Sequence, residues 1–385
     1  MSVIALAGTL CAIAYSLFTL WCAVSFRRSI VGAVYDRASH ADTQFTPAVS
    51  ILKPLCGMDP HAYESLRSHC VQDYPAFEII FGVSDPDDEI VPAVQRLMKE
   101  FPAIPMKLVN CTQRLGSNLK ISNLIQMIPN ARHEFLIIND SDIEVPKDYL
   151  QRVIAPLEQT SVGMVTCLYR GIAGRTIGSK LESLGISSDF IPGVLCAKVI
   201  DGGIHFGLGS TLAFSRKTLE TIGGLQPLAD FLADDYQLGY RISQAHLNVE
   251  FADCVVDHYL PPYSFSAFFQ HQLRWARAIR TSRPGGYVGL IFTFAIPWSL
   301  LNVLLMPGAA YTWLCFAAAV FLRYAVWLAV QTRVLRTARV LADFWLLPIR
   351  DLIAVIVWIA CYGGHHVVWR GKRFALVNGK LRESS

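Results

Sequence analysis

The sequence predicts an α/β domain attached to a membrane, because three of its features agree on that fold class. Residues 3–26 contain no charged residue, and neither do residues 284–322. Between them, residues 45–280 alternate short apolar runs with helical patterns. The chain is 53% hydrophobic and 17% charged, which is more apolar and less charged than a typical soluble domain.

The first apolar stretch predicts a membrane anchor. A helix rises about 1.5 Å per residue, so roughly 20 apolar residues cross the hydrocarbon. The stretch lacks the basic start and the small-residue cleavage site of a signal peptide, which favours a retained helix. Arg27, Arg28 and Arg37 follow it, and the positive-inside tendency then places residues 27–287 in the cytosol.

The C-terminal third predicts further membrane helices. Residues 284–322 are long enough for two spans, with Pro307-Gly308 as the turn between them. The loop that contains Arg333, Arg336 and Arg339 is expected to be cytosolic. Residues 344–369 either cross the bilayer or lie partly in its interface, because Arg350-Asp351 stands near their start. With four full spans the basic tail would face outward, against the positive-inside tendency.

We therefore expect four parts in the chain: residues 1–27 as the N-terminal membrane anchor, 28–287 as a cytosolic domain, 288–370 as C-terminal membrane helices and 371–385 as a basic tail.

The cytosolic domain reads as a doubly wound α/β fold with a mainly parallel sheet. Its apolar runs predict strands, and its amphipathic stretches predict helices between them. In such sheets, ligands bind beyond the carboxyl ends of the strands. The expected strands are 48–52, 77–83, 106–109, 135–138 and 162–166, and the expected helices are 88–101 and 147–157.

Carboxylates follow two of these strands. Asp85, Asp87 and Asp88 come after the strand 77–83. Asp140-Ser-Asp142 comes after the strand 135–138, and two carboxylates at this spacing can converge on Mg²⁺ or Mn²⁺. The alternative is that these residues only form turns and helix caps. We favour that alternative for Asp87 and Asp88, and leave both interpretations open for the other pair.

Two later segments carry further candidate groups. Asp234-Asp235 opens a helical pattern, and either carboxylate could serve as a general base, although a helix N-terminus favours acidic residues in any case. Arg274 and Arg277 form part of a basic helical stripe beside Trp275. That stripe either binds a substrate or anchors the chain at the membrane interface.

Taken together, these motifs resemble the signature of the inverting GT-A glycosyltransferases of family 2. The resemblance is carried by Asp85, by Asp140-Ser-Asp142, by Asp235 and by the element 271–275. More narrowly, the chain resembles the ceramide glucosyltransferase branch, family 21. Further segments that match this pattern are 51–60, 116–124, 207–211 and Gly223-Gly224.

Within that branch, the chain looks most like bacterial hopanoid-biosynthesis glycosyltransferases. The segments that carry this likeness are 167–171, 184–190 and 282–287. It implies an inverting enzyme of the bacterial inner membrane that moves N-acetylglucosamine from UDP-GlcNAc to a bacteriohopanepolyol. The alternative is a ceramide glucosyltransferase that uses UDP-glucose.

The resemblance also implies where the donor binds. Asp85 would contact the nucleoside, and Lys53 and Pro54 would line the uracil pocket. Lys120 is expected to contact the donor as well. Asp140 and Asp142 would hold the diphosphate through a divalent metal, Mg²⁺ or Mn²⁺; which of the two ligates the metal stays open, because ceramide enzymes keep only the first.

The resemblance assigns the remaining roles to the later motifs. Asp235 would be the catalytic base, Arg274 would stabilise the departing diphosphate and Trp275 would wall the acceptor side. The element departs from the family pattern at His271, where glutamine or arginine is usual. A one-residue shift would let Gln272 supply the amide.

Composition limits the other function classes. The net charge of +4 is too small to predict nucleic-acid binding, and the ten cysteines show no zinc-site spacing. A processive polysaccharide synthase shares the same motifs but would need more spans for a channel. The expected partners are a UDP-sugar, a lipid acceptor and the bilayer, and the sequence specifies no oligomeric state.

Overall fold

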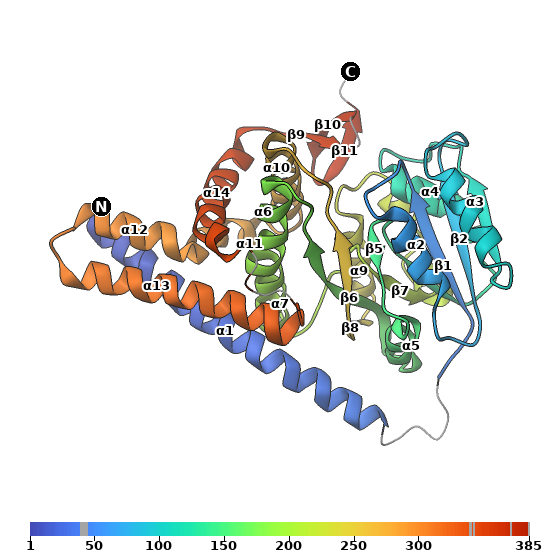
Figure 1. Cartoon of the computed structure of the whole chain (residues 1–385), viewed down its shortest axis with the longest axis horizontal. Helices are drawn as coiled ribbons and strands as arrows, with labels where there is room; N and C mark the ends of the chain where they lie inside the picture. The colour runs from blue at the N-terminus through green and yellow to red at the C-terminus, as the bar shows by residue number, and fades with distance from the viewer. Residues whose placement is uncertain (39–44, 339–340, 342, 370–371, 384–385) are drawn as a thin grey trace. The chain divides into compact units, whose positions relative to one another are not determined.

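The computed structural model describes residues 1–38, 45–338, 341, 343–369 and 372–383, with the side chains of residues 27–38 outside that description (Figure 1). The side chains of Arg27, Arg28 and Arg37, and all of Arg339 and Arg370, therefore lie outside the described residues. The chain forms two compact units. The helical unit comprises Met1–Arg37, Ala173–Gly202 and Pro262–Arg373, and the α/β unit comprises Ala38–Ile172, Gly203–Pro261 and Phe374–Ser385.

The α/β unit is built on an eight-stranded mixed sheet in the order β3-β2-β1-β4-β7-β6-β8-β5. Four neighbouring strands, from β3 to β4, are parallel, while β7 runs antiparallel to both β4 and β6. Buried apolar side chains dominate the central strands, which explains the continuous hydrophobic runs in the sequence. The strands are β1 Val49–Leu55, β2 Phe77–Val83, β3 Met106–Asn110, β4 Phe135–Ile138, β5 Ile143–Glu144, β6 Val162–Ile172, β7 Leu212–Ser215 and β8 Asn248–Tyr259.

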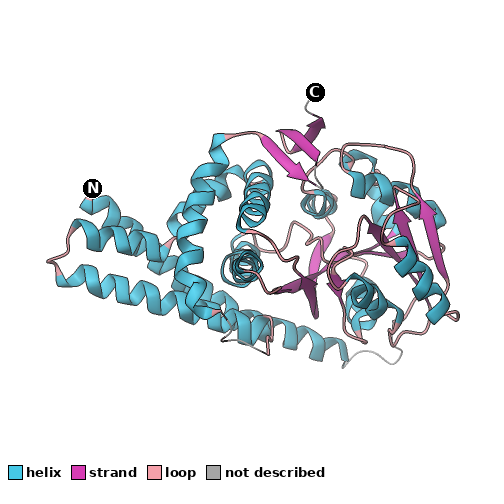
Figure 2. Ribbon diagram, turned by 45° about the horizontal axis from the view of Figure 1, so that its top comes forward, coloured by secondary structure: helices cyan, strands magenta, loops and turns pink. Residues whose placement is uncertain are grey.

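Helices follow the strands of this unit and cover the sheet (Figure 2). Asn118 caps α4 by accepting a hydrogen bond from the Ile121 backbone N–H, and α9 begins at Asp234. The helices are α2 Ala62–Cys70, α3 Val91–Glu100, α4 Leu119–Met127, α5 Tyr149–Ile154, α8 Arg216–Thr221 and α9 Asp234–Gln244.

A C-terminal hairpin belongs largely to the same unit. Strands β10 (Lys372–Val377) and β11 (Lys380–Glu383) pair antiparallel around Asn378-Gly379. Both turn residues have positive φ, 50° and 78°, as a two-residue type I′ turn requires. The residues expected to form a basic tail therefore include a folded hairpin.

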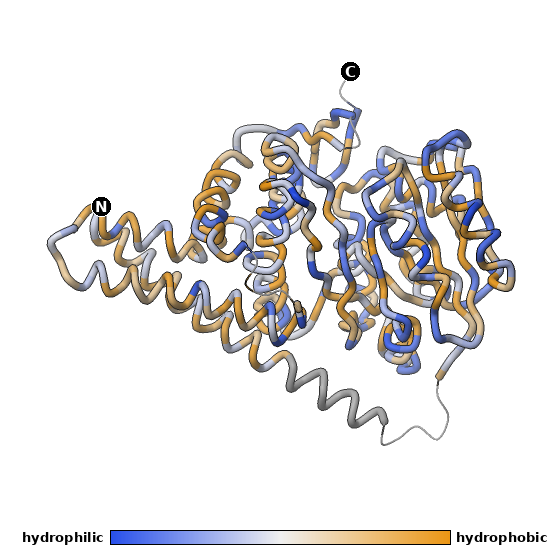
Figure 3. The backbone as a smooth tube through the Cα atoms, viewed as in Figure 1, coloured by the Kyte–Doolittle hydropathy of each residue, from blue (hydrophilic) through white to orange (hydrophobic). Residues whose placement is uncertain are grey.

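The helical unit contains the apolar segments, which appear mostly hydrophobic along α12, α13 and α14 in Figure 3. Small residues let α1, α12 and α13 approach closely: Ala12, Ala295 and Ala319 form one buried cluster, and a Cβ at Gly8 would lie 2.5 Å from the Trp298 ring. The helices are α1 Ser2–Ala38, α6 Ile177–Gly185, α7 Ile191–Ile200, α10 Phe265–Ser282, α11 Pro284–Gly289, α12 Ala295–Leu305, α13 Ala310–Ala329 and α14 Leu347–Ala360, with a short strand β9 His366–Trp369.

Among the described residues, four helical segments are long and apolar enough to cross a membrane. They are Ser2–Phe26, Ile177–Ile200, Ala310–Val334 and Phe344–Gly363. A fifth candidate, Pro284–Thr293 with Ala295–Leu305, is bent by 50°. The expected break at Pro307-Gly308 is confirmed, because it separates α12 from α13. The segment Ile177–Ile200 was not expected, since it is less apolar than the other three and lies inside the predicted cytosolic domain.

The predicted α/β fold with apolar helices at both ends is confirmed. The expected strands coincide with β1, β2, β3, β4 and the first half of β6. The sheet differs from a doubly wound one in its second half, where β7 reverses the direction.

Candidate active site

Lys53 fixes the loop that follows β4. It lies on β1 with no exposed surface, and its Nζ donates a hydrogen bond to the Asp140 carbonyl oxygen at 2.7 Å. Burial lowers the pKa of Lys53 to about 7, although the nearby Asp140 and Asp142 carboxylates oppose this shift. The structure thus places this predicted donor-binding residue underneath the Asp140–Asp142 loop. Pro54, the next residue, is half-buried on the same strand.

Lys120 connects two of the predicted carboxylate motifs. Its Nζ lies 2.6 Å from Asp140 Oδ1 and 3.6 Å from Asp234 Oδ2. Burial alone would lower the pKa of Lys120, but the attraction of Asp140 and Asp234 raises it above its ordinary value. Lys120 is therefore a fixed ammonium group at the carboxyl ends of β1 and β4.

Asp235 stands at the start of α9, held by two backbone N–H groups. The Gly209 N–H donates to Oδ2 at 2.8 Å, and the Tyr236 N–H donates to Oδ1 at 2.7 Å. Burial and the neighbouring Asp234 raise the pKa of Asp235 to about 6, while Lys120 lowers it. A carboxylate with such a pKa can accept a proton near neutral pH.

Gly209 shows that these groups meet at one point. A Cβ atom at this position would lie 3.2 Å from Asp140 Oδ2, 3.3 Å from Asp235 Oδ2 and 3.7 Å from Lys120 Nζ. Glycine thus leaves space between groups that are far apart in the sequence. We call Lys120, Asp140, Asp234 and Asp235 the strand-end cluster.

Asp142 occupies a different environment from Asp140. Its Oδ2 lies 3.1 Å from His258 Nε2, and its Oδ1 is buried without a hydrogen-bond partner among the described residues. Burial raises the pKa of Asp142, but His258 and Lys53 outweigh this effect and hold the pKa below its ordinary value. Asp142 is therefore a charged carboxylate with one unused oxygen atom.

These carboxylates fit a divalent metal that shares its ligands with a substrate. In the part of the chain that the structure describes, no three His, Cys, Asp or Glu side chains converge on one metal position. Mg²⁺ nevertheless binds through one or two carboxylates together with phosphate and water oxygens. The unused Oδ1 of Asp142 and the 39% exposed side chain of Asp140 could supply the protein's share.

The carboxylates after β2 have local roles in the structure. Asp85 is exposed, and its Oδ1 accepts a hydrogen bond from the Asp87 N–H at 3.0 Å. Asp88 accepts hydrogen bonds from the N–H groups of Gly57 and Ile90. Asp88 thus has the turn-forming role that we favoured, whereas the expected nucleoside contact of Asp85 remains a prediction.

The 271–275 element lies on α10, in the helical unit. Trp275 packs edge-on against Phe190, with ring centroids 5.2 Å apart, and lies 5.4 Å from the His271 ring. Gln272 is bonded at both ends of its amide: Nε2 donates to Glu182 Oε2 at 2.8 Å, and Oε1 accepts from Arg350 Nη2 at 2.7 Å. Its amide is therefore engaged inside its own unit. Arg274 lies half-buried on the same helix.

Gln272 belongs to a longer series of buried polar groups in this unit. Arg350 also lies 3.1 Å from Asp189, and Arg323 pairs with both Asp189 and Asp351. Asp189 sits in a π-helical turn, Ile186–Phe190, between α6 and α7. We call Glu182, Gln272, Arg350, Asp189, Arg323 and Asp351 the buried polar chain. Sequence reasoning missed it, although Arg323 and Arg350-Asp351 are charged residues within apolar stretches, which is the signal for such contacts.

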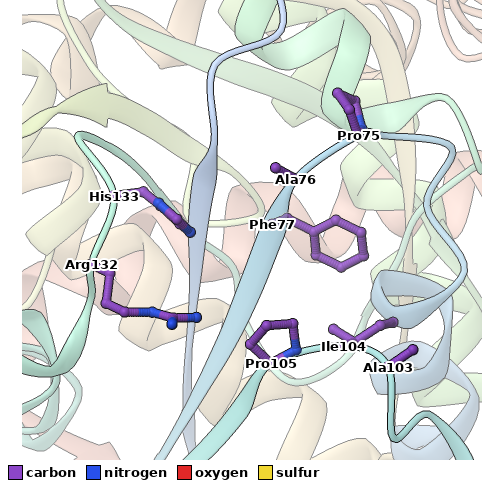
Figure 4. Close-up of a pocket in the computed structure, with 8 residues that line it drawn as sticks. All are labelled: Pro75, Ala76, Phe77, Ala103, Ile104, Pro105, Arg132 and His133. Carbon is purple, nitrogen blue, oxygen red and sulfur yellow. The ribbon is translucent and has the colours of Figure 1, made fainter.

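A surface pocket lies at the other ends of the strands, away from the strand-end cluster (Figure 4). Its lining residues precede or begin the parallel strands β2, β3 and β4, so it opens at their amino ends. None of the predicted site residues lines it. The lining consists of Pro75, Ala76, Phe77, Ala103, Ile104, Pro105, Arg132 and His133.

Comparison with known proteins identifies related sequences over nearly the whole chain. A family model described as Glycosyl transferase family 21 matches residues 4–382. Ceramide glucosyltransferase 3 of Caenorhabditis elegans is 24% identical over 232 residues, which cover 60% of this chain and 50% of that protein. Ceramide glucosyltransferase of Candida albicans is 26% identical over 128 residues, or 30% of this chain and 24% of that protein. The chain spans at most about half the length of these curated relatives.

A solved structure shares the fold. The mannosyltransferase PcManGT from Pyrobaculum calidifontis, in complex with GDP-Man and Mn²⁺, superposes with a TM-score of 0.55 at 20% identity. The match covers 94% of this chain and 98% of that one. The likeness extends the GT-A type of fold to this chain.

Proposed function

The chain belongs to glycosyl transferase family 21 and is a glycosyltransferase, and we propose its reaction from that premise. It moves one hexose from a UDP-sugar to a hydroxyl group of a membrane lipid, with inversion at the anomeric carbon. The observation that carries the proposal is the convergence of Lys120, Asp140 and Asp235 around Gly209. In this proposal, Asp235 accepts a proton, and Lys120 and Asp140 bind the donor diphosphate next to it.

Asp235 is the proposed general base. In the transfer, the acceptor oxygen attacks the anomeric carbon, its proton passes to the Asp235 carboxylate and the bond to the diphosphate breaks. The buried position of Asp235 and the adjacent Asp234 charge raise its pKa to about 6, which makes it more basic than an ordinary carboxylate. The Gly209 and Tyr236 N–H groups hold both of its oxygens in a fixed orientation.

The donor diphosphate is proposed to lie beside Lys120, Asp140 and Asp142. Asp140 and Asp142 would hold a divalent cation, which would supply positive charge to the leaving group. Lys120 adds a fixed ammonium group next to Asp140. The predicted roles of Asp85 at the nucleoside, and of Arg274 and Trp275 at the diphosphate and the acceptor, remain part of the proposal.

Two acceptor and donor pairs are candidates. The resemblance of segments 167–171, 184–190 and 282–287 favours UDP-GlcNAc with a bacteriohopanepolyol. The curated relatives, which are named ceramide glucosyltransferases, favour UDP-glucose with ceramide. With either pair, the lipid must reach the site from a bilayer, and we propose that it enters along the aromatic segment 263–269. The proposed membrane is a bacterial inner membrane, with the catalytic domain on its cytoplasmic side.

Turnover by the full-length protein in detergent with Mg²⁺ tests this function. UDP-GlcNAc and UDP-glucose are each offered with bacteriohopanetetrol and with ceramide, and the Asp235→Asn variant serves as the control. We expect a lipid carrying one inverted sugar from one pair. A polymer would instead indicate a processive synthase, and no product from any pair would contradict the proposal.

A further inference from the structure

The loop in front of α9 carries the proposed base and is held from two sides. On one side, Asn118 Nδ2 donates hydrogen bonds to the Phe231 carbonyl oxygen at 2.8 Å and to Asp234 Oδ1 at 3.2 Å. The Ser117 N–H donates to Asp230 Oδ1 at 2.9 Å. These contacts connect the loop to the segment that leads into Lys120.

The C-terminal hairpin holds the other side of the loop through backbone hydrogen bonds. The Leu381 N–H donates to the Asp230 carbonyl oxygen at 2.7 Å, and the Leu232 N–H donates to the Gly379 carbonyl oxygen at 3.0 Å. Phe231 pairs with Lys380 as an antiparallel bridge. Strand β11 thus adds a short strand pairing to the loop, two residues before Asp234.

The hairpin is built to keep its shape. Leu376 pairs with Leu381, and both side chains are buried. Gly379 adopts φ 78°, which lets its carbonyl oxygen face Leu232 within a tight turn. Glu383 forms an ion pair with Arg114 at 2.6 Å, which ties the end of β11 to the segment before Asn118.

We propose that the C-terminal hairpin, residues 372–383, is a positioning clasp for the loop that carries Asp234 and Asp235. The clasp holds this loop against Asn118, so that Asp235 stays beside Gly209 and Lys120 when substrates exchange. The effect of the clasp on catalysis rests on the proposed function of Asp235, whereas its effect on the position of the loop does not.

Removal of β11 tests the clasp in the full-length protein. The test variant ends after Val377, and the control variant ends after Glu383, which keeps every contact described above. Hydrogen exchange is measured on the amides of residues 230–233, and turnover is measured with the UDP-sugar and lipid pair that the intact protein uses. We expect exchange at least tenfold faster, a kcat at least tenfold lower and a donor KM within twofold of the control.

The pH profile gives a readout that loss of packing elsewhere would not change. Asp234, Asp140 and Lys120 are the charged groups that face Asp235. A loosened loop hydrates Asp235 and so weakens the largest cause of its raised pKa, which falls from about 6 toward the usual range of aspartate. The acid limb of kcat should therefore move to lower pH in the truncated variant.

A second variant covers the case in which the truncated protein does not fold. Gly379→Val keeps the chain length but strains the turn, and Arg382→Val, an exposed position on the same hairpin, is its control. We expect the same changes in exchange and kcat in smaller measure. Unchanged exchange at residues 230–233 would overturn the clasp whatever the activity, and faster exchange with unchanged kcat would reduce it to packing. Absence of any transfer by the intact protein would refute the proposed function, and the exchange measurement would still decide whether the clasp exists.

Discussion

The strand-end cluster and the buried polar chain both collect charged side chains, yet they arrange those charges differently. In the strand-end cluster, three carboxylates surround a single ammonium group, that of Lys120. In the buried polar chain, Arg350 lies between Asp189 and Gln272, and Arg323 lies between Asp189 and Asp351.

The difference separates a reactive site from a structural one. In the strand-end cluster, burial and the adjacent Asp234 carboxylate leave Asp235 with a raised pKa. In the buried polar chain, each guanidinium lies between polar groups of opposite charge or dipole, and the chain connects helices α6, α10, α13 and α14. The arrangement of the charged groups, more than their number, distinguishes the two regions.

Loss of the carboxylate at Asp235 should have the largest effect on catalysis. Asp235→Asn keeps the shape and removes the proton acceptor, so we expect kcat to fall by about 10²- to 10⁴-fold. Donor binding and the thermal unfolding temperature should stay close to those of the wild type, measured by isothermal titration with UDP and by calorimetry. Near-normal turnover would remove Asp235 from the mechanism.

Loss of a guanidinium from the buried polar chain should affect stability instead. Arg350 is 5% exposed, and Arg350→Met leaves the buried Gln272 Oε1 without its donor and Asp189 with Arg323 as its remaining ion-pair partner. We expect the free energy of unfolding to fall by about 1–3 kcal/mol, the cost of an unsatisfied buried acceptor. Arg333→Met, at an exposed position in the same unit, is the matched control in thermal unfolding of the full-length protein. Equal unfolding temperatures for the two variants would contradict the structural role.

The smallest expected effect is that of pH on turnover near neutral pH. The proposed base acts only when deprotonated, so kcat should be level above about pH 6 and fall about tenfold per unit below it. Asp234→Asn removes a charge that raises the pKa of Asp235, and should move this limb to lower pH. A wild-type limb near pH 4 would show that Asp235 titrates as an ordinary aspartate.

Local patterns in the sequence predict most of the fold and the carboxylates of the strand-end cluster, whereas Lys120 was expected only from the family resemblance. Apolar runs mark the central strands, and the rule that ligands gather at carboxyl ends leads to Asp140 and Asp142. The hairpin around Asn378-Gly379 was not predicted, since residues 371–385 were expected to form a basic tail, although this pair is a strong hairpin signal. Its contact with the loop before α9 carries no such signal, since backbone pairing between distant segments leaves no pattern in either segment.

The burial of Lys53 and the bonded amide of Gln272 could not be predicted for a similar reason. A lysine at the end of an apolar run looks accessible in the sequence, and only the neighbouring strand shows that its ammonium group reaches the Asp140 carbonyl oxygen. Gln272 looks available for a ligand until Glu182 and Arg350, from two other helices, are placed around it.

The division of the chain into two units restricts the number of times it can cross a bilayer. The chain leaves the α/β unit after Ile172 and returns at Gly203, then leaves after Pro261 and returns at Phe374. If that unit stays on one side, each excursion must make an even number of crossings. The single helical segment Ile177–Ile200 then cannot be a span, and it is also the candidate with the largest buried share, 56%.

The same parity applies to the second excursion. Its described residues contain three candidates, namely the bent pair and the segments Ala310–Val334 and Phe344–Gly363. If all other residues stay on the side of the α/β unit, one of the three must turn back or lie along the surface. The C-terminal hairpin, which belongs largely to the α/β unit, then lies on the same side of the bilayer as the rest of that unit.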